Sequence, residues 1–380
     1  MNFICPRCGE SDERYIGYKN NVPYCRRCIS FIGENATYVQ NNVTENALEL
    51  NYSLTKEQRR ISTRITKNYI EGTSTLIKAV CGAGKTELVY GVINYALSRG
   101  HRIGFAIPRK DVVIELEDRI RKAFPKNHVV SIYGGHHEIL TADIVILTTH
   151  QIYRYEQYFD LLIMDEVDAF PFSNNNMLLR LSSNSVKGTL VMMSATPEPS
   201  LLKLFNQPNH EILELNTRYH GHALPVPEIV VKLGFLKYEY LRKKLTIFKL
   251  EHKPVLIFVP TISDCETLYK KLKRDGFEKG NYVHSKRRNR EQIIKDFKFN
   301  KYQFLVTTAV LERGVTIKNL QVIIYDSDSP IYNTSSLIQI SGRVGRKYDA
   351  PKGEVIFLSS HISDEMAEAK QRIIDKNLFL

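Results

Sequence analysis

Eight residues in the first half of the chain have the types and spacing that bind a nucleotide phosphate. The loop Ala79-Val80-Cys81-Gly82-Ala83-Gly84-Lys85-Thr86 follows an apolar run and has the P-loop spacing, with alanine at the first glycine position. Small residues let backbone N–H groups wrap phosphate oxygens. Lys85 would reach the β- and γ-phosphates, and the Thr86 hydroxyl would ligate Mg²⁺. The loop therefore predicts a site for ATP and Mg²⁺.

Two adjacent carboxylates supply the second half of this chemistry. Asp165 and Glu166 come directly after the apolar run LLIM (161–164). Open parallel sheets bind ligands at the carboxyl ends of their strands. We expect Asp165 to hold Mg²⁺, and Glu166 to orient and activate the attacking water.

A third group of polar residues lies near the end of the chain. The stretch QISGRVGR contains Gln339, Arg343 and Arg346. The three-residue spacing places both arginines on one face of a predicted helix. An arginine that reaches a bound triphosphate stabilises transition-state charge and increases the rate by roughly 10³–10⁵. We expect both arginines to be catalytic.

Four cysteines near the N-terminus have metal-ligand spacing. Cys5, Cys8, Cys25 and Cys28 form the pattern C-x₂-C-x₁₆-C-x₂-C, which is a strong signature of a structural zinc site. An iron–sulfur cluster is the alternative. Zinc binding at such sites is worth roughly 10–16 kcal/mol, so we expect the module not to fold without metal.

The charge distribution separates this module from the basic part of the chain. Residues 1–48 contain five Lys/Arg and five Asp/Glu, whereas residues 231–303 contain 19 Lys/Arg and eight Asp/Glu. Phosphate neutralisation dominates nucleic-acid affinity. We therefore expect the module to have a docking or stabilising role. We expect the second half of the chain to bind a polyanionic partner. Local contacts from the module remain an alternative, through Arg7, Arg26, Arg27, Tyr15, Tyr18 and Tyr24.

The elements that must position these residues follow a regular order. Short apolar runs alternate with stretches that read as helices, which is typical of parallel α/β sheets. The first series is 75–80, 103–107, 128–132, 144–149, 161–164 and 189–193; the second is 254–259, 281–285, 303–308, 321–326 and 354–358. The stretch 216–229, with two prolines, reads as a linker. We expect a zinc module (1–48) and two α/β domains (49–216 and 217–380).

Bulk composition limits the class of protein. The chain of 380 residues has a formal net charge of +12, which indicates a polyanionic partner. It shows no signal peptide and no apolar run long enough to span a membrane. We expect a cytoplasmic protein without an integral membrane segment, with peripheral attachment at the inner face of the membrane as an option.

Taken together, these motifs resemble the superfamily-two helicases. In order along the chain, the matching stretches are LTKEQ (54–58), the P-loop, PRK (108–110), GG (134–135), TTHQ (148–151), DEVD (165–168), SATP (194–197), LIFVPT (256–261), TTAVLERGVTI (307–317) and QISGRVGR. The resemblance implies two tandem RecA-like domains that hydrolyse ATP while a single nucleic-acid strand lies across them.

The resemblance also implies roles for residues that spacing alone does not assign. Gln58 would read adenine, and Gly314 would lie at the ATP site. Ser194, Thr196 and Gln339 would couple hydrolysis to strand binding. The residues expected to contact DNA are Pro108, Arg109, Lys110, Gly135, Thr149, His150, Thr261, Thr307 and Thr308. The chain has Thr316 where the family often has aspartate, which leaves that carboxylate's role unfilled.

A narrower resemblance covers the whole chain. The four-cysteine module, DEVDAFPF, TTAVLERGVTI and QISGRVGR look like the ComFA family of late-competence ATPases, with a more distant similarity to the primosomal helicase PriA. This implies a single-stranded-DNA-stimulated ATPase and translocase in the uptake of transforming DNA. Its implied partners are ComFC, DprA and a membrane DNA channel. Alternatives are a repair or replication-restart helicase, an RNA-remodelling enzyme and a non-catalytic adaptor.

Overall fold

The chain folds into two compact units. The computed structural model describes residues 3–28, 34–136, 139–168, 172, 175–309 and 316–378. The first unit consists of residues 1–79 and 84–215, and the second of residues 80–83 and 216–380. The four residues 80–83 of the P-loop are thus grouped with the second unit, although the strand before them and the helix after them belong to the first.

A seven-stranded parallel sheet forms the centre of the first unit. Its strand order is β5-β6-β4-β7-β8-β3-β9. The strands are β3 (Ser74–Ala79), β4 (Ile103–Ile107), β5 (Val129–Ile132), β6 (Ile144–Thr148), β7 (Phe159–Met164), β8 (Val186–Ser194) and β9 (His210–Leu215). Strands β4, β5 and β6 are buried along their whole length, as expected when helices cover both faces of a parallel sheet.

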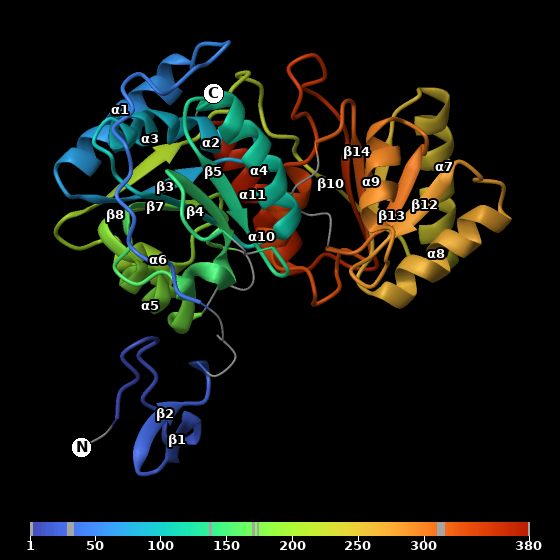
Figure 1. Ribbon diagram of the computed structural model, residues 1–380. Helices are drawn as coiled ribbons and strands as arrows, with labels where there is room; N and C mark the ends of the chain where they lie inside the picture. Colours follow the sequence, from blue (N-terminus) through green and yellow to red (C-terminus); the bar gives the residue numbers. More distant parts are fainter. Residues whose placement is uncertain are drawn as a thin grey trace. The chain divides into compact units, whose positions relative to one another are not determined.

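Helices lie above and below this sheet (Figure 1). They are α1 (Lys56–Ile70), α2 (Lys85–Leu88), α3 (Tyr90–Leu97), α4 (Lys110–Ala123), η3 (Thr149–Arg154), α5 (Asn176–Ser185) and α6 (Pro199–Leu204). Helix α1 begins with a capping box, in which the Thr55 hydroxyl accepts from the Gln58 N–H and the Gln58 side chain accepts from the Thr55 N–H.

The N-terminal residues of the first unit form a small knuckle and an extended segment. After η1 (Glu13–Tyr15), strands β1 (Ile16–Lys19) and β2 (Val22–Cys25) pair in an antiparallel hairpin. Its two-residue turn has positive φ at both Asn20 and Asn21, a conformation that asparagine tolerates and that suits tight hairpins. The later residues lie along the first unit: the Thr44 N–H donates to the Leu97 carbonyl and the Leu48 N–H to Asn94.

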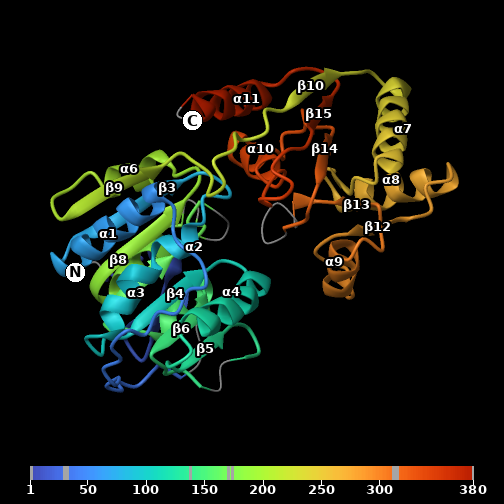
Figure 2. The same cartoon turned by 90° about the horizontal axis from the view of Figure 1, so that it is seen from above.

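A six-stranded parallel sheet forms the centre of the second unit, in the order β10-β15-β14-β11-β13-β12. Its strands are β10 (Glu228–Val231), β11 (Val255–Phe258), β12 (Gly280–Val283), β13 (Phe304–Thr307), β14 (Gln321–Tyr325) and β15 (Val355–Ser359). Its helices are α7 (Phe235–Leu250), α8 (Ile262–Arg274), α9 (Arg290–Lys298), α10 (Thr334–Ser341) and α11 (Asp364–Asn377). Figure 2 shows α7 and α8 on one side of β14, with α10 and α11 on the other.

Among the described strands of the two parallel sheets, β9 and β10 were not predicted from the sequence; the β1–β2 hairpin was not predicted either. Strands β9 and β10 each lie at the edge of a sheet, and most residues of each are exposed or half-buried, with two buried residues in β9 and one in β10. The expected linker 216–229 therefore ends inside a strand, because β10 begins at Glu228. Within the residues that the structure describes, no helix combines the length and apolarity needed to cross a bilayer.

Candidate functional site

The predicted nucleotide motifs converge on one half of the first sheet's carboxyl edge. The P-loop follows β3, Asp165 and Glu166 follow β7, and Ser194 ends β8. These three strands are neighbours in the order β7-β8-β3. Parallel strands end at the same edge, where open α/β sheets bind ligands. The topology therefore brings together residues that lie more than a hundred positions apart.

Backbone conformation explains the glycines of the P-loop. Gly82 and Gly84 have φ of 83° and 75°, in the left-handed region that glycine adopts without steric cost. A Cβ on Gly84 would also lie 2.5 Å from Nε2 of Gln58. The Gln58 side chain thus reaches the P-loop. The amide oxygen of this side chain, Oε1, accepts a hydrogen bond from the Thr55 N–H. Its expected contact with adenine stays a proposal.

Lys85 and Asp165 face each other across this edge. Nζ of Lys85 lies 3.7 Å from Oδ1 of Asp165, and both side chains are largely buried. Thr86, the next residue of α2, is 8 % exposed. A carboxylate and a hydroxyl are the hard oxygen ligands that Mg²⁺ prefers. Thr86 and Asp165 therefore fit the predicted Mg²⁺ site, and Lys85 fits a cation for the phosphates.

Glu166 has an unusual backbone conformation. Its φ is 55°, and its N–H donates to Oδ1 of Asp165 at 2.8 Å. A non-glycine residue in the left-handed region costs on the order of 1–3 kcal/mol, and such residues cluster at active sites. Asp165 itself extends β7, because its N–H donates to the Ala106 carbonyl. No local sequence pattern predicted this turn.

The coupling residues Ser194 and Thr196 connect to the acidic motif. The Thr196 hydroxyl donates to Oδ2 of Asp168 at 2.9 Å, and the Thr196 N–H donates to the Ser194 hydroxyl. The Val167 N–H donates to the Met193 carbonyl. The segment after β8 is therefore bonded directly to the segment after β7. This contact supports the predicted coupling role of Thr196.

The predicted arginines do not lie on a helix, and that expectation was wrong. Helix α10 ends at Ser341, and Gly342 to Gly345 form turns. Gly345 has φ of 69°, which a helix cannot contain. Arg343 is 1 % exposed, and Nε of Arg346 donates to the Gly342 carbonyl at 2.8 Å. Gln339 is buried within α10. Gly314 lies outside the described residues.

The residues expected to contact DNA in the first unit gather on the other half of the same edge. Pro108, Arg109 and Lys110 follow β4, Gly135 follows β5, and Thr149 and His150 follow β6. These strands are neighbours in the order β5-β6-β4. Lys110 and His150 are exposed, whereas Thr149 is buried. Arg109 pairs with Asp111 at 2.6 Å, and a Cβ on Gly135 would meet open space.

In the second unit the expected DNA contacts follow two neighbouring strands. Thr261 follows β11 and caps α8, where its hydroxyl accepts from the Asp264 N–H. Thr307 ends β13 and is fully buried, and its hydroxyl donates to the Thr308 carbonyl. Thr308 is half-buried. The structure leaves Thr308 with more access to a ligand than Thr307.

The four predicted metal ligands lie together in the knuckle. Their sulfur atoms are all within 4.8 Å of one another, with 3.8 Å between Cys5 and Cys28 and 3.6 Å between Cys8 and Cys25. Four thiolates at a Zn–S distance of about 2.3 Å in a tetrahedron would be about 3.8 Å apart. Cys5, Cys8, Cys25 and Cys28 therefore fit a closed structural zinc site, which supports the zinc prediction.

The knuckle contacts the rest of the first unit through side-chain hydrogen bonds to backbone carbonyls. Nη2 of Arg7 donates to the Tyr153 carbonyl at 3.0 Å, and Nδ2 of Asn184 donates to the Arg7 carbonyl at 2.9 Å. Met177 packs against the cysteine cluster. Arg7, one of the residues considered for local DNA contacts, thus contacts η3 instead. These contacts support a docking role for the module.

Removal of metal is expected to unfold the knuckle and leave the core of the first unit intact. Zinc coordination supplies roughly 10–16 kcal/mol to such modules, and Cys81 and Cys265 are buried elsewhere. Chelation under reducing conditions should therefore release one zinc per chain and make four additional thiols reactive, measured by metal analysis and thiol titration. Cys265→Ala is the control and should keep its zinc. Iron in the purified protein, or four reactive thiols before chelation, would contradict the zinc assignment.

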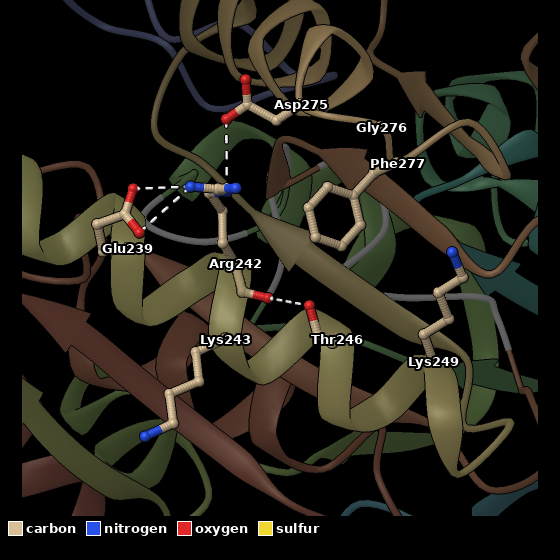
Figure 3. Close-up of a pocket in the computed structure, with 8 residues that line it drawn as sticks. All are labelled: Glu239, Arg242, Lys243, Thr246, Lys249, Asp275, Gly276 and Phe277. Atoms are coloured by element: carbon tan, nitrogen blue, oxygen red, sulfur yellow. Dashed lines mark hydrogen bonds and ion pairs between the residues drawn. The ribbon is translucent and has the colours of Figure 1, made fainter.

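A surface hollow on the second unit carries part of its basic charge. It has a volume of about 410 Å³ and lies beside α7 and the end of α8 (Figure 3). Arg242, at its centre, pairs with Glu239 at 3.0 Å and Asp275 at 3.4 Å, while Lys243 and Lys249 point apart (Figure 3). Of the described residues that line it, none was predicted to bind a ligand. Because two carboxylates neutralise Arg242, we assign no anion site here.

Sequence reasoning treated Arg218, Tyr219 and His220 only as part of a linker. All three contact the turn that contains the predicted arginines. Their partners lie about 125 positions further along the chain, so no local pattern could have identified them.

Comparison with known proteins identifies the family. Residues 51–199 match the family model described as "Type III restriction enzyme, res subunit", and residues 236–348 match the "Helicase conserved C-terminal domain". Competence protein ComFA of Bacillus subtilis is 32% identical over 398 residues, which cover 99% of this chain and 86% of that protein. The chain belongs to the ComFA family. Its ComFA relative in Streptococcus pneumoniae is 31% identical, over 98% of this chain and 89% of that protein.

These matches confirm the predicted family and enzyme class. The chain is an ATP hydrolase of the helicase and translocase class. Among solved structures, a leucine-to-valine variant of S. cerevisiae Dbp5 bound to RNA and ADP BeF3 has a TM-score of 0.65 at 18% identity, over 85% of this chain and 92% of that chain. At this identity the likeness concerns the fold alone. It confirms the predicted α/β class with two parallel-sheet domains.

Proposed function

We propose that this member of the ComFA family is a single-stranded-DNA-stimulated ATPase that translocates along the strand during uptake of transforming DNA. The observation that carries the proposal is the carboxyl edge of the first sheet. Its β7-β8-β3 half holds the Lys85–Asp165 pair, and its β5-β6-β4 half holds Lys110 and His150. In this proposal one sheet edge carries both the nucleotide site and a strand-binding site.

The proposed chemistry assigns each residue of the nucleotide half a separate task. Lys85 binds the β- and γ-phosphates, while Thr86 and Asp165 would hold Mg²⁺, which would neutralise charge on the phosphates. Glu166 accepts a proton from the attacking water. Arg343 and Arg346 stabilise the charge that develops in the transition state. Gln58 orients the base from its position beside Gly84.

The proposed binding of the single DNA strand is electrostatic, and the basic residues responsible lie mainly in the second unit. Residues 231–303 carry a net charge of +11, from 19 basic and eight acidic residues, whereas residues 1–48 are neutral. Phosphate contacts dominate nucleic-acid affinity. We assign backbone contacts to Arg109, Lys110, Gly135 and His150 in the first unit, and to Thr261 and Thr308 in the second.

The competence role rests on family membership over 99% of the chain. We propose that the protein works with ComFC, DprA and a membrane DNA channel, which the family resemblance implies. The knuckle is neutral and its Arg7 is used in docking on η3, so we assign it to stabilising the first unit or receiving a partner.

Measurement of the ATP hydrolysis rate against three nucleic acids tests the proposal. We expect single-stranded DNA to stimulate hydrolysis more strongly than duplex DNA or RNA. Lys85→Ala is the control and should remove the stimulated rate, because the phosphate cation is lost. Stimulation by RNA alone would contradict the proposal. A rate that duplex DNA raises most, together with strand separation, would identify a repair or restart helicase instead.

A further inference from the structure

Three consecutive residues after the first sheet contact four of the five residues 342–346 near the end of the chain. We call Arg218, Tyr219 and His220 the clamp, and residues 342–346 the arginine turn. Both segments belong to the second unit. Each clamp residue donates a hydrogen bond to a backbone carbonyl of the arginine turn, and this turn contains both proposed catalytic arginines.

Arg218 makes the most extensive contacts of the three. Its Nη1 donates to the carbonyls of Val344 at 3.0 Å and Gly345 at 2.8 Å, and its Nη2 donates to Gly342 at 3.4 Å. The residue is 3 % exposed, and burial lowers the pKa of its guanidinium to about 10, so it remains charged at neutral pH. Bonds from a charged, rigid fork of donors are stronger and more directional than neutral ones.

Tyr219 and His220 add one bond each. The Tyr219 hydroxyl donates to the Arg346 carbonyl at 3.1 Å. Nε2 of His220 lies 2.9 Å from the Gly345 carbonyl, and Nδ1 of His220 accepts from the His222 N–H at 3.2 Å. Since a carbonyl only accepts, Nε2 must carry the proton, and the acceptor Nδ1 must be free of one. The two contacts fix a single neutral tautomer of His220.

The glycines of the arginine turn are required by this close packing. A Cβ on Gly345 would lie 2.2 Å from the Pro351 carbonyl oxygen and 3.0 Å from Nη1 of Arg218. A Cβ on Gly342 would lie 2.5 Å from Cβ of Cys81, a P-loop residue grouped in the same unit. The Tyr219 N–H donates to the Gly82 carbonyl at 3.2 Å. The clamp therefore contacts the arginine turn with its side chains and the P-loop with its backbone.

We propose that Arg218, Tyr219 and His220 are positioning residues for hydrolysis: they hold the backbone of the arginine turn so that Arg343 is presented in its reactive orientation. We assign Arg218 to the arginine turn because its two terminal nitrogens donate to three carbonyls there, while its Nε makes no hydrogen bond within the part of the chain that the structure describes. The inference rests on the role proposed above for Arg343. It predicts that the clamp affects turnover more than ATP binding.

Conservative variants of the full-length protein test this inference. Arg218→Lys keeps the charge but loses the fork, and we expect its kcat to fall roughly 10- to 100-fold. Tyr219→Phe loses one bond, and we expect a decrease of about 3- to 10-fold. The KM for ATP should stay within about twofold, as for an interaction made only in the transition state. Tyr348→Phe, at a tyrosine 74 % exposed, is the matched control.

Hydrogen exchange supplies a readout that activity alone does not. The N–H groups of Gly342, Arg343 and Val344 donate to carbonyls of α10, so their exchange rates report on the turn. Hydrogen exchange of these amides should accelerate in Tyr219→Phe. The midpoint of thermal unfolding should stay close to that of the unsubstituted protein, although turnover falls. An unchanged kcat with faster exchange would show that the clamp is purely structural. A raised KM with unchanged kcat would make Arg218 a nucleotide ligand. Either result would overturn the inference.

A double-mutant cycle separates failure of the clamp from failure of the proposed function. If the clamp acts through Arg343, Tyr219→Phe should have little further effect on kcat once Arg343→Lys is present, because coupled residues are not additive. Fully additive effects would refute the clamp and leave the role of Arg343 intact. A normal rate in Arg343→Lys and Arg343→Ala would instead refute the proposed role of Arg343.

Discussion

Arg343→Ala is expected to slow ATP hydrolysis by about 10³- to 10⁵-fold, the effect of removing an arginine that stabilises phosphoryl-transfer charge. Arg343 is 1 % exposed, so its orientation is fixed by the surrounding residues and little would need to reorganise during the reaction. Phosphate release under saturating ATP and single-stranded DNA measures the effect. Binding of a fluorescent ATP analogue should be much less affected.

A buried arginine also contributes to folding, so this prediction needs a second variant. Arg343→Lys keeps the charge but loses the planar fork of donors, and we expect it to remain slow while folding normally. Arg372→Ala, an exposed arginine paired with Glu368 on α11, is the matched control and should hydrolyse ATP normally. If both Arg343 variants were folded and fully active, the transition-state cation would have to be another residue.

Glu166→Gln is expected to bind ATP normally and to hydrolyse it about 10²- to 10⁴-fold more slowly, the usual contribution of a general base. Glutamine has nearly the same shape, so the left-handed backbone at this position, with φ of 55°, should change little. It cannot accept the proton of the attacking water. Single-turnover hydrolysis and nucleotide affinity, measured on the same preparation, separate the two steps.

The matched control for Glu166→Gln is Glu71→Gln. Glu71 is exposed, follows the last residue of α1 and pairs with Lys67 in the last turn of that helix. It should leave both the rate and the affinity unchanged. A normal hydrolysis rate in Glu166→Gln would mean that another residue orients the water. A loss of ATP affinity would show instead that the Glu166 carboxylate helps to hold nucleotide or metal before the chemical step.

The parts of the fold that could be predicted from the sequence are those with a local pattern. Strands such as β4 and β6 are continuous apolar runs because they are buried on both faces. Strands β9 and β10 escaped prediction because only two residues of β9 and one of β10 are buried, so neither has the fully buried pattern of a central strand. The end of α10 at Ser341 escaped because Gly342 and Gly345 override the helical spacing of the two arginines.

By itself the sequence determined the chemical inventory of this protein: a P-loop, a carboxylate pair, two arginines and four thiols in metal-ligand spacing. These motifs are short, and their backbone requirements appear as glycines and apolar flanks within a few residues. Only the tertiary structure decided which residues meet. It placed Arg7 against Tyr153 and Arg218 against Val344, which lie 146 and 126 positions away. Such contacts depend on strand order and packing, which no local pattern records.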